Sequence, residues 1–345
     1  MATTLTTDQV IGNPIQFFLE EQRYHGKTER TLQAYERVLS DFTVFVKETT
    51  PNEAIDTVER RTCMEWVHSL RAEKASSTVA TYASYVNRFF RYMVEVGEFS
   101  ANPMSLVIEQ MPESIEADPV RRDIALPDMR VFVAECRHPL TKALVITLLK
   151  TGMRVGELCN LDIRDISCEW PLSKDYPPYR AALEGRQEAI YVDSSISLGD
   201  EVNGETRTAS NKRQRTTIIP MDEELIYVLT QWLAIRPDVH SPAEPLFVDT
   251  GDSWGERLTP EDVRYRLRCK TTPFGWHQSG ADASENVTPH YFRHFFTTYL
   301  RDRTGDRGIV KYLRGDVADD VIDTYTHNWG DRVEERYREN IYSLL

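Results

Sequence analysis

Apolar side chains in the first 110 residues recur every three or four positions, which is the spacing of one face of an amphipathic helix. The apolar positions of such faces fall in four stretches, at residues 15–19, 32–46, 63–70 and 79–93. The connections between these stretches are short, and Asn102 with Pro103 ends the pattern. The pattern therefore predicts an N-terminal bundle of four helices within a domain of residues 1–110.

A second domain is predicted over residues 126–345, beyond a polar stretch. Residues 111–125 contain two prolines and no periodicity, which predicts a linker. Helical spacing then returns at residues 128–136, 140–151, 222–233, 260–269, 290–301, 308–314, 319–326 and 331–345. Short β-branched or alternating runs at residues 161–166, 189–192 and 216–220 predict a small antiparallel sheet, with a long polar loop between the last two. The expected fold is mainly α, with a helical first domain and a mixed α+β second domain.

The chain is acidic, because 54 acidic residues stand against 41 basic ones and the formal net charge is −13. Taken alone, this charge disfavours a nucleic-acid partner, since phosphates are contacted by cations. Arginine outnumbers lysine among the bases. An acidic, lysine-poor chain fits a salt-loaded cytoplasm, so a halophilic origin is our hypothesis.

Other compositional features exclude several classes of protein. The chain contains no run of about 18 apolar residues, and residues 1–13 lack the basic and then apolar pattern of an export signal, so we expect a cytoplasmic protein. The five cysteines are widely spread and include no CxxC pair. Neither a zinc site nor a redox dithiol is therefore expected.

Two short segments place polar side chains three residues apart. In TGMRVGEL, Arg154 and Glu157 can pair on one helix face. An exposed ion pair is the commoner outcome, but the apolar neighbours favour a half-buried arginine held as an anion clamp. In TPHYFRHFF, His290 and Arg293 lie near a helix start, a position that suits a phosphate, whereas the structural alternative is a capping histidine and a surface arginine. The spacing around Tyr325, in IDTYTH, is typical of a tyrosine that packs in the protein core.

In their combination and order, these segments resemble those of the tyrosine recombinases of the phage integrase family, of the Xer-like or archaeal mobile-element kind. The segments TGMRVGEL, HYFR and IDTYTH follow the family's order, and the N-terminal part is similar to its helical, SAM-like core-binding domain. The resemblance implies that Tyr325 is the nucleophile and that Arg154 and Arg293 clamp the phosphate. From its spacing, Glu157 is expected to orient Arg154. His290 is implied to assist proton transfer at the tyrosine or to bind a phosphate oxygen.

Lys212 matches a further position of the family pattern, whereas Asp316 departs from it. The family uses a lysine on a β-hairpin, and Lys212 stands eight residues before Pro220, as that lysine commonly does; a solvated loop cation beside Arg213 and Arg215 is the alternative. Nine residues before its tyrosine the family usually has histidine or tryptophan, but this chain has Asp316. An ionised carboxylate repels phosphate at short range, so Asp316 is expected to point away, to orient a neighbouring arginine or histidine, or to be neutral.

The resemblance implies a site-specific DNA recombinase that works through a 3′-phosphotyrosyl intermediate, with no metal and no cofactor. Its implied partner is double-stranded DNA with specific recombination sites, bound by a homotetramer that is a monomer or weak oligomer when free of DNA, and no membrane is involved. The C-terminal helix docks either on a neighbouring subunit or on its own domain. Relaxation of DNA in the manner of a type IB topoisomerase, and non-catalytic DNA binding on the same fold, are the alternative functions.

Overall fold

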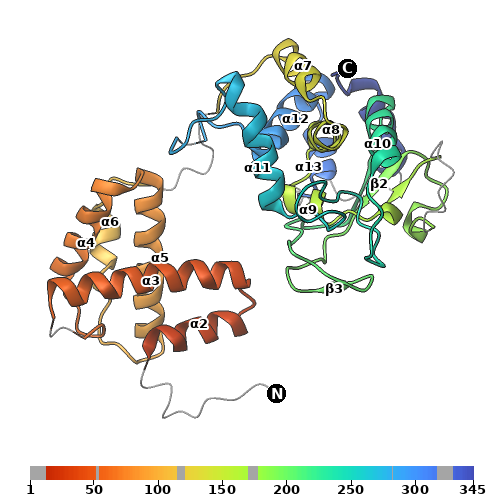
Figure 1. Cartoon of the computed structure of the whole chain (residues 1–345). Coiled ribbons are helices and arrows are strands. Elements are labelled where there is room, and N and C mark those ends of the chain that lie inside the picture. Colours follow the sequence, from red (N-terminus) through yellow and green to blue (C-terminus); the bar gives the residue numbers. More distant parts are fainter. Residues whose placement is uncertain (1–12, 52–53, 115–120, 170–177, 282, 317–328) are drawn as a thin grey trace. The chain divides into compact units, whose positions relative to one another are not determined.

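A computed structural model of the chain describes residues 13–51, 54–114, 121–169, 178–281, 283–316 and 329–345 (Figure 1). The chain divides into two compact units, Met1–Asp118 and Pro119–Leu345, called unit 1 and unit 2. The break lies within the segment that the sequence predicts to be a linker. None of the described helices is both long enough and apolar enough to cross a membrane.

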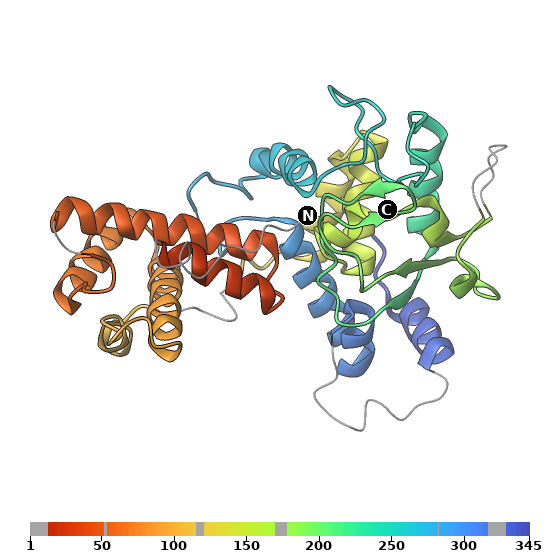
Figure 2. The ribbon, with the colours of Figure 1, turned by 90° about the horizontal axis from the view of Figure 1, so that it is seen from below.

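Unit 1 is a helical bundle around an aromatic core. Its helices in the described residues are α2 (Pro14–Tyr24), α3 (Glu29–Thr49), α4 (Arg60–Glu73), α5 (Ser76–Glu95) and α6 (Ser105–Gln110). Helices α2 and α3 lie side by side (Figures 1 and 2). The rings of Phe18, Phe42 and Phe89 are fully buried between the helices, which is why the predicted apolar faces fold together.

The predicted end of the bundle at Asn102 and Pro103 is wrong. The Asn102 side chain accepts a hydrogen bond from the backbone N–H of Met104 at 3.0 Å, and helix α6 begins at the next residue. Val107 of this helix is buried in the core of unit 1. A short helix with one buried apolar residue leaves too weak a periodic signal for the hydrophobic pattern to predict it.

Unit 2 is built around α8 (Pro139–Thr151), which packs against α10 (Glu223–Ile235) and α12 (Pro289–Thr304) (Figure 1). Nearly every residue of α8 is buried, Lys150 included, so the helix packs against the protein on all sides rather than through one amphipathic face. The other helices of unit 2 are α7 (Leu126–Glu135), α9 (Val155–Cys159), α10 (Glu223–Ile235), α11 (Pro260–Thr271), α12 (Pro289–Thr304), α13 (Arg307–Arg314) and α14 (Trp329–Asn340).

The predicted antiparallel sheet is present, with the strand order β1-β2-β5. Its strands are β1 (Ile166–Ser167), β2 (Ala189–Val192) and β5 (Thr217–Pro220). The prediction of a strand at residues 161–166 is mostly wrong, since Ile163–Asp165 forms a 3-10 turn. The Asp165 carboxylate accepts a hydrogen bond from the backbone N–H of Asp162 at 2.8 Å, which bends the chain before the strand starts.

The polar loop between β2 and β5 contains a second hairpin, formed by β3 (Glu201–Val202) and β4 (Glu205–Thr206). Asn203 and Gly204 turn it with φ values of 56° and 79°, the left-handed conformation of a two-residue turn. Arg207 follows β4 and is fully buried, where its guanidinium makes two hydrogen bonds with Asp162, at 3.0 and 2.7 Å. The loop is therefore an ordered layer on unit 2, although its composition is polar.

The C-terminal helix is shorter than the sequence predicts, because α14 ends at Asn340 and the last five residues run without helix. Lys150, fully buried in α8, donates a hydrogen bond to the Tyr342 carbonyl at 2.5 Å and pairs with Glu224 at 2.8 Å. Glu224 in turn accepts the backbone N–H groups of Leu344 and Leu345. These contacts dock the tail on its own unit. The helix predicted at residues 319–326 lies outside the described residues.

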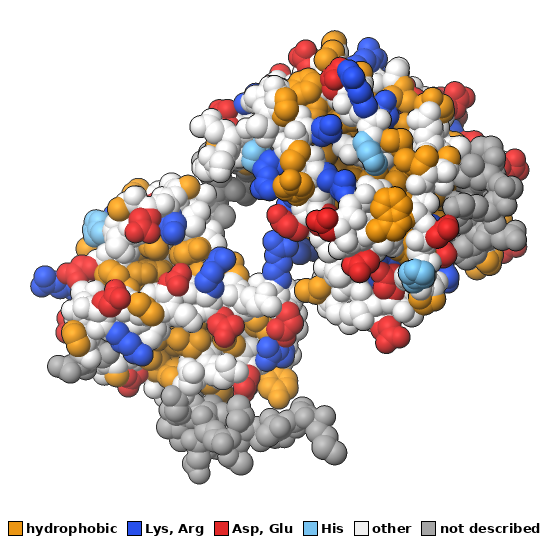
Figure 3. Space-filling model, in the orientation of Figure 1, with side chains coloured by type: hydrophobic (Ala, Val, Ile, Leu, Met, Phe, Trp, Pro, Cys, Tyr) orange, Lys and Arg blue, Asp and Glu red, His pale blue; other side chains and the backbone are white. Residues whose placement is uncertain are grey.

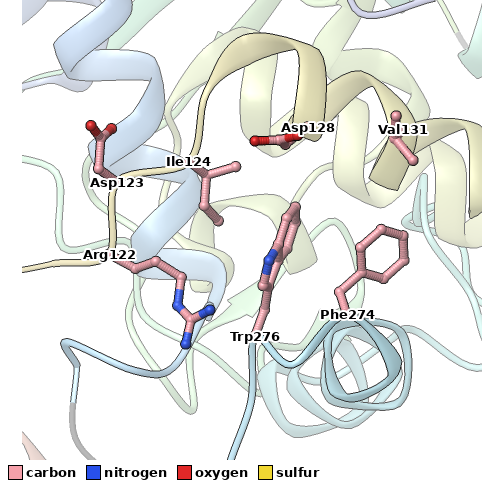
Figure 4. A pocket seen from close by; sticks show the side chains of 7 residues that line it. All are labelled: Arg122, Asp123, Ile124, Asp128, Val131, Phe274 and Trp276. Atoms are coloured by element: carbon pink, nitrogen blue, oxygen red, sulfur yellow. The ribbon is translucent and has the colours of Figure 1, made fainter.

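The last residues of the predicted linker pack on unit 2. Ile124 is buried, and Arg122 forms an ion pair with Glu285 at 2.9 Å. A pocket of about 300 Å³ lies beside this segment, and the ring centroids of Phe274 and Trp276 in its lining are 5.0 Å apart. Figure 4 shows the side chains that line it. Its lining includes none of the residues that the motifs single out.

Candidate active site

The turn between α8 and α9 places Arg154. Gly152 follows the last residue of α8 with a left-handed φ of 61°, and a Cβ there would lie 2.2 Å from Cδ1 of Phe296. Only glycine meets both conditions without strain. Arg154 is then the residue before α9, and the buried Glu157 carboxylate accepts its backbone N–H at 2.9 Å and its guanidinium at 3.2 Å. The structure thus shows the pair that the spacing of three residues predicts, and it fixes the arginine at both ends.

Arg293 lies one turn into α12 and is buried rather than a surface charge. Its guanidinium donates to the carbonyl of Gly152 at 2.7 Å and to the carbonyl of Arg314 at 3.2 Å. Burial, together with the positive charges of Arg154 and Arg314, lowers the pKa of Arg293 to about 9, which keeps the group protonated at neutral pH. The same glycine that sets the turn before Arg154 therefore also anchors Arg293.

Asp316 follows α13, after Gly315 ends that helix with a φ of 68°. Its carboxylate pairs with three guanidinium groups: Nη2 of Arg154 at 3.3 Å, Nη2 of Arg293 at 3.0 Å and Nε of Arg314 at 2.9 Å. Of the three expectations for this position, the geometry matches the one in which the carboxylate orients neighbouring arginines. Asp316 points into the arginine cluster rather than away from it.

Lys212 lies between two buried neighbours. The Asn211 side chain donates to the Asp193 carbonyl at 2.7 Å and accepts from Asn160 at 2.8 Å. On the other side, Arg213 pairs with Glu157 at 3.0 Å and donates to the carbonyl of Leu313. Lys212 itself is exposed and forms no ion pair within the described part of the chain. The loop backbone is thus fixed on both sides of a free ammonium group.

His290 lies in the first turn of α12, where part of its surface is exposed to solvent and part of its ring is covered. Partial burial of the ring lowers its pKa below the usual 6.5, and the guanidinium groups of Arg121, Arg293 and Arg154 lower it further, in that order. A histidine with a lowered pKa is neutral at pH 7 and can accept a proton. Tyr325 lies outside the described residues, so the structure does not place it against this histidine.

The structure therefore brings Arg154, Glu157, Arg293 and Asp316 into one cluster, with His290 under the influence of its charges. Two cluster members were missed by sequence reasoning as site residues, Arg213 and Arg314. Neither stands in a periodic or spaced motif, so no sequence signal separates them from the other arginines. In the described residues, no group of three or more His, Cys, Asp or Glu side chains has the arrangement of a metal site.

Comparison with known proteins finds the same protein family for both units. A family model described as the phage integrase family matches residues 195–330, and one described as the phage integrase N-terminal SAM-like domain matches residues 15–97. Together the two matches span more than half of the chain. Among similar proteins, tyrosine recombinase XerC of Pelobacter propionicus is 24% identical over 94% of this chain and 95% of its own length. Tyrosine recombinase XerA of Pyrococcus horikoshii is 23% identical over 92% of this chain and 90% of its own.

Solved structures share the fold. The Tn1549 transposon integrase in complex with transposon right end DNA has a TM-score of 0.64 at 16% identity, over 90% of this chain and 96% of that chain. A lambda integrase dimer bound to a COC′ core site has a TM-score of 0.57 at 14% identity, over 96% of this chain and 78% of that chain. With both units matched in order by family models and by relatives along nearly their whole length, this chain belongs to the phage integrase family of tyrosine recombinases.

Proposed function

We propose that this chain is a site-specific recombinase that cuts and rejoins duplex DNA through a 3′-phosphotyrosyl intermediate. The observation that carries the proposal is the convergence of Arg154, from the turn before α9, and Arg293, from α12, on a single carboxylate. Each guanidinium is fixed from behind, by Glu157 and by the Gly152 carbonyl respectively. A preorganised pair of guanidinium groups is what a phosphodiester needs as charge develops on its non-bridging oxygens.

The remaining residues supply the nucleophile and the proton transfers. The Tyr325 oxygen attacks the scissile phosphorus, and the bond from phosphorus to the 5′ oxygen breaks. His290, neutral at pH 7, accepts the proton of the tyrosine, while Lys212 donates a proton to the departing 5′ oxygen. The phosphotyrosyl link conserves the energy of the phosphodiester, so the reverse attack by a 5′ hydroxyl of another strand reseals the DNA without ATP.

The net charge of −13 is compatible with DNA binding because the cations of the site are local. Figure 3 shows acidic and basic side chains interspersed over the face in view, rather than one extended field of a single sign. The four guanidinium groups of Arg154, Arg213, Arg293 and Arg314 lie in one cluster with only two carboxylates, those of Glu157 and Asp316, among the described residues. A local excess of positive charge remains to attract a phosphate.

On DNA we propose a homotetramer, in the cytoplasm, with a monomer or weak oligomer when DNA is absent. A lambda integrase tetramer bound to a Holliday junction shares the fold, with a TM-score of 0.59. In this chain the apolar residues Val333 and Tyr337 of α14 are buried on their own unit. Light scattering of the free protein and of its complex with a recovered site tests this: one subunit free and four on paired sites is the expected result, and a stable free tetramer contradicts it.

The recombinase proposal is tested on total DNA, so that the recombination site need not be chosen in advance. The protein is incubated in high salt with fragmented DNA from its source, captured under denaturing conditions, and the DNA that stays attached is sequenced. We expect one sequence to be enriched with the wild-type protein and lost with Tyr325→Phe, with Tyr337→Phe as a matched control that retains it. Attachment with no sequence preference, together with relaxation of supercoiled DNA, supports a topoisomerase. The absence of attached DNA, together with retained binding, supports a non-catalytic DNA-binding protein.

The halophile hypothesis has a separate test. A chain with a net charge of −13 repels itself at low ionic strength, and salt screens that repulsion. Circular dichroism during transfer from molar to low salt should therefore show loss of helix. A helix signal that is independent of salt contradicts the hypothesis and leaves the recombinase assignment intact.

A further inference from the structure

A carboxylate occupies the centre of the arginine cluster. Asp316 stands at the position where the family resemblance implies a phosphate donor, yet it accepts hydrogen bonds from Arg154 and Arg293 and forms an ion pair with Arg314. Its Oδ1 faces Arg154 and Arg293, at 3.3 and 3.0 Å, and its Oδ2 faces Arg314 at 2.9 Å. Two oxygens bridging several guanidinium groups is also the way in which a phosphate is held.

Arg314 is held in this cluster by its backbone. Its carbonyl accepts two hydrogen bonds from the Arg293 guanidinium, each at 3.2 Å. The next residue, Gly315, has left-handed φ, and a Cβ there would lie 2.2 Å from Cγ of Arg213. The main chain that carries Arg314 therefore lies directly against the Arg213 side chain. Its side chain is about one third exposed, so it can be reached by a ligand from solvent.

The guanidinium groups of the cluster carry more positive charge than Asp316 alone neutralises, so they favour the binding of an external anion. Glu157 is committed to Arg154 and Arg213, both through hydrogen bonds. Asp316 is therefore the one carboxylate that faces Arg293 and Arg314 together within the described part of the chain. Asp316 is partly exposed and its carboxylate turns about single side-chain bonds, so it can rotate out when a stronger anion enters.

We propose that Arg314 is a further phosphate-contacting residue of the active site, and that the Asp316 carboxylate marks, in the DNA-free protein, the place that oxygens of the scissile phosphate take. The proposal rests on the proposed function and deepens it. The arginine at position 314 supplies the third donor that an aspartate at position 316 cannot supply. The third guanidinium and the internal carboxylate act as a pair, in which the carboxylate keeps the cluster ordered until DNA arrives.

The test uses inorganic phosphate as the probe and isothermal titration calorimetry of the full chain at constant ionic strength. Asp316→Asn removes the internal anion, and we expect phosphate to bind about tenfold more tightly than to the wild type. Adding Arg314→Gln to Asp316→Asn should weaken binding by at least about tenfold, whereas Arg314→Lys should weaken it less because the charge is kept. Arg301→Gln, an exposed arginine of α12 paired with Asp302, is the matched control and should change nothing.

The proposal is overturned if Asp316→Asn binds phosphate no more tightly than the wild type, or if Arg314→Gln has no larger effect than Arg301→Gln. Circular dichroism and the unfolding temperature of each variant show whether it is folded, and the Lys variant covers the case in which Gln fails to fold. A DNA arm separates this inference from the recombinase proposal. On a recovered site, Arg314→Gln should slow adduct formation about 100-fold, while a wild type that forms no adduct contradicts the recombinase proposal and leaves the phosphate result valid.

Discussion

Glu157 and Arg213 form an ion pair with both side chains fully buried, and 3.0 Å separates Oε2 of the glutamate from Nη2 of the arginine. The pair joins α9, which follows Arg154, to the loop that carries Lys212. Arg213 also donates to the Leu313 carbonyl, so the same side chain reaches α13. Three segments that are distant in sequence are thus fixed to one another behind the cluster of guanidinium groups.

Arg213→Leu should lower the free energy of unfolding of unit 2 by about 3–5 kcal/mol, because it removes one of the two guanidinium partners of the buried Glu157 carboxylate and the hydrogen bond to the Leu313 carbonyl. The measurement is urea unfolding followed by circular dichroism. Arg61→Gln is the control, since Arg61 and Glu65 form an exposed pair on α4 that is worth about 1 kcal/mol or less. Equal effects of the two substitutions would show that the buried pair does not organise the site.

Gly152→Ala should destabilise the protein and also reduce adduct formation. The added Cβ would meet the Phe296 ring, and the turn carries the carbonyl that anchors Arg293. Gly305→Ala is a close control, because Gly305 ends α12 with a φ of 66° but has open space around a Cβ. We expect a cost of about 1 kcal/mol at Gly305, from left-handed strain alone, and about 1–3 kcal/mol more at Gly152. Thermal unfolding with equal shifts for the two variants contradicts the packing argument.

The lowered pKa of His290 predicts a pH dependence of activity. Because the ring stays neutral below its usual pKa of about 6.5, the rate of adduct formation should hold through that pH and fall only at lower pH. His290→Ala should reduce the rate at pH 7 by about 100-fold or more, as the loss of a general base does. An inflection of the wild-type rate above pH 6.5 that the alanine variant abolishes would contradict this account.

The same pKa has a consequence for stability, with a defined sign. The folded chain binds the His290 proton less readily than the unfolded chain, so this histidine makes no contribution well above pH 6.5 and destabilises the fold as the pH falls. The penalty is complete once the pH is below the lowered pKa of the folded state. Urea unfolding between pH 7.5 and pH 5 should therefore show His290→Asn gaining stability relative to the wild type. A constant difference between the two proteins across this range is the contrary result.

The C-terminal tail should contribute strongly to the stability of unit 2. Tyr342 is buried, and its hydroxyl donates to the Leu149 carbonyl at 2.5 Å. Tyr342→Ala should cost about 3–5 kcal/mol, because it opens a cavity and removes this hydrogen bond. Leu345→Ala, at a residue that is 51% exposed, should cost about 0.5 kcal/mol or less. A small cost of Tyr342→Ala in urea unfolding would show that the tail is not docked on its own unit in solution.

Much of the helical architecture could be predicted, because amphipathic faces leave a periodic record. The long helices α3 and α5 bury the apolar residues that the pattern singles out. The β3-β4 hairpin was not predicted, since each strand has two residues and its surroundings are polar. Asn203 followed by Gly204 was the available signal. The end of α14 was beyond prediction, because it depends on buried contacts of Lys150 and Glu224 from other parts of the chain.

The site could be predicted only where its residues are close in sequence. The contact of Arg154 with Glu157 follows from a spacing of three residues. The contact of Arg154 with Asp316 joins positions 162 residues apart, so no local pattern contains it. Likewise, Arg213 reads as a surface cation beside Lys212, and only the fold shows that it is buried against Glu157.

In the proposed mechanism, Tyr325 becomes covalently joined to the 3′ end of cut DNA. The most direct measurement is mass spectrometry of the adduct after nuclease and protease digestion. We expect a peptide that contains Tyr325 and carries a nucleotide through its 3′ phosphate, with a free 5′ hydroxyl on the other DNA end. A nucleotide on a different residue, or attachment through a 5′ phosphate, would rule out this mechanism.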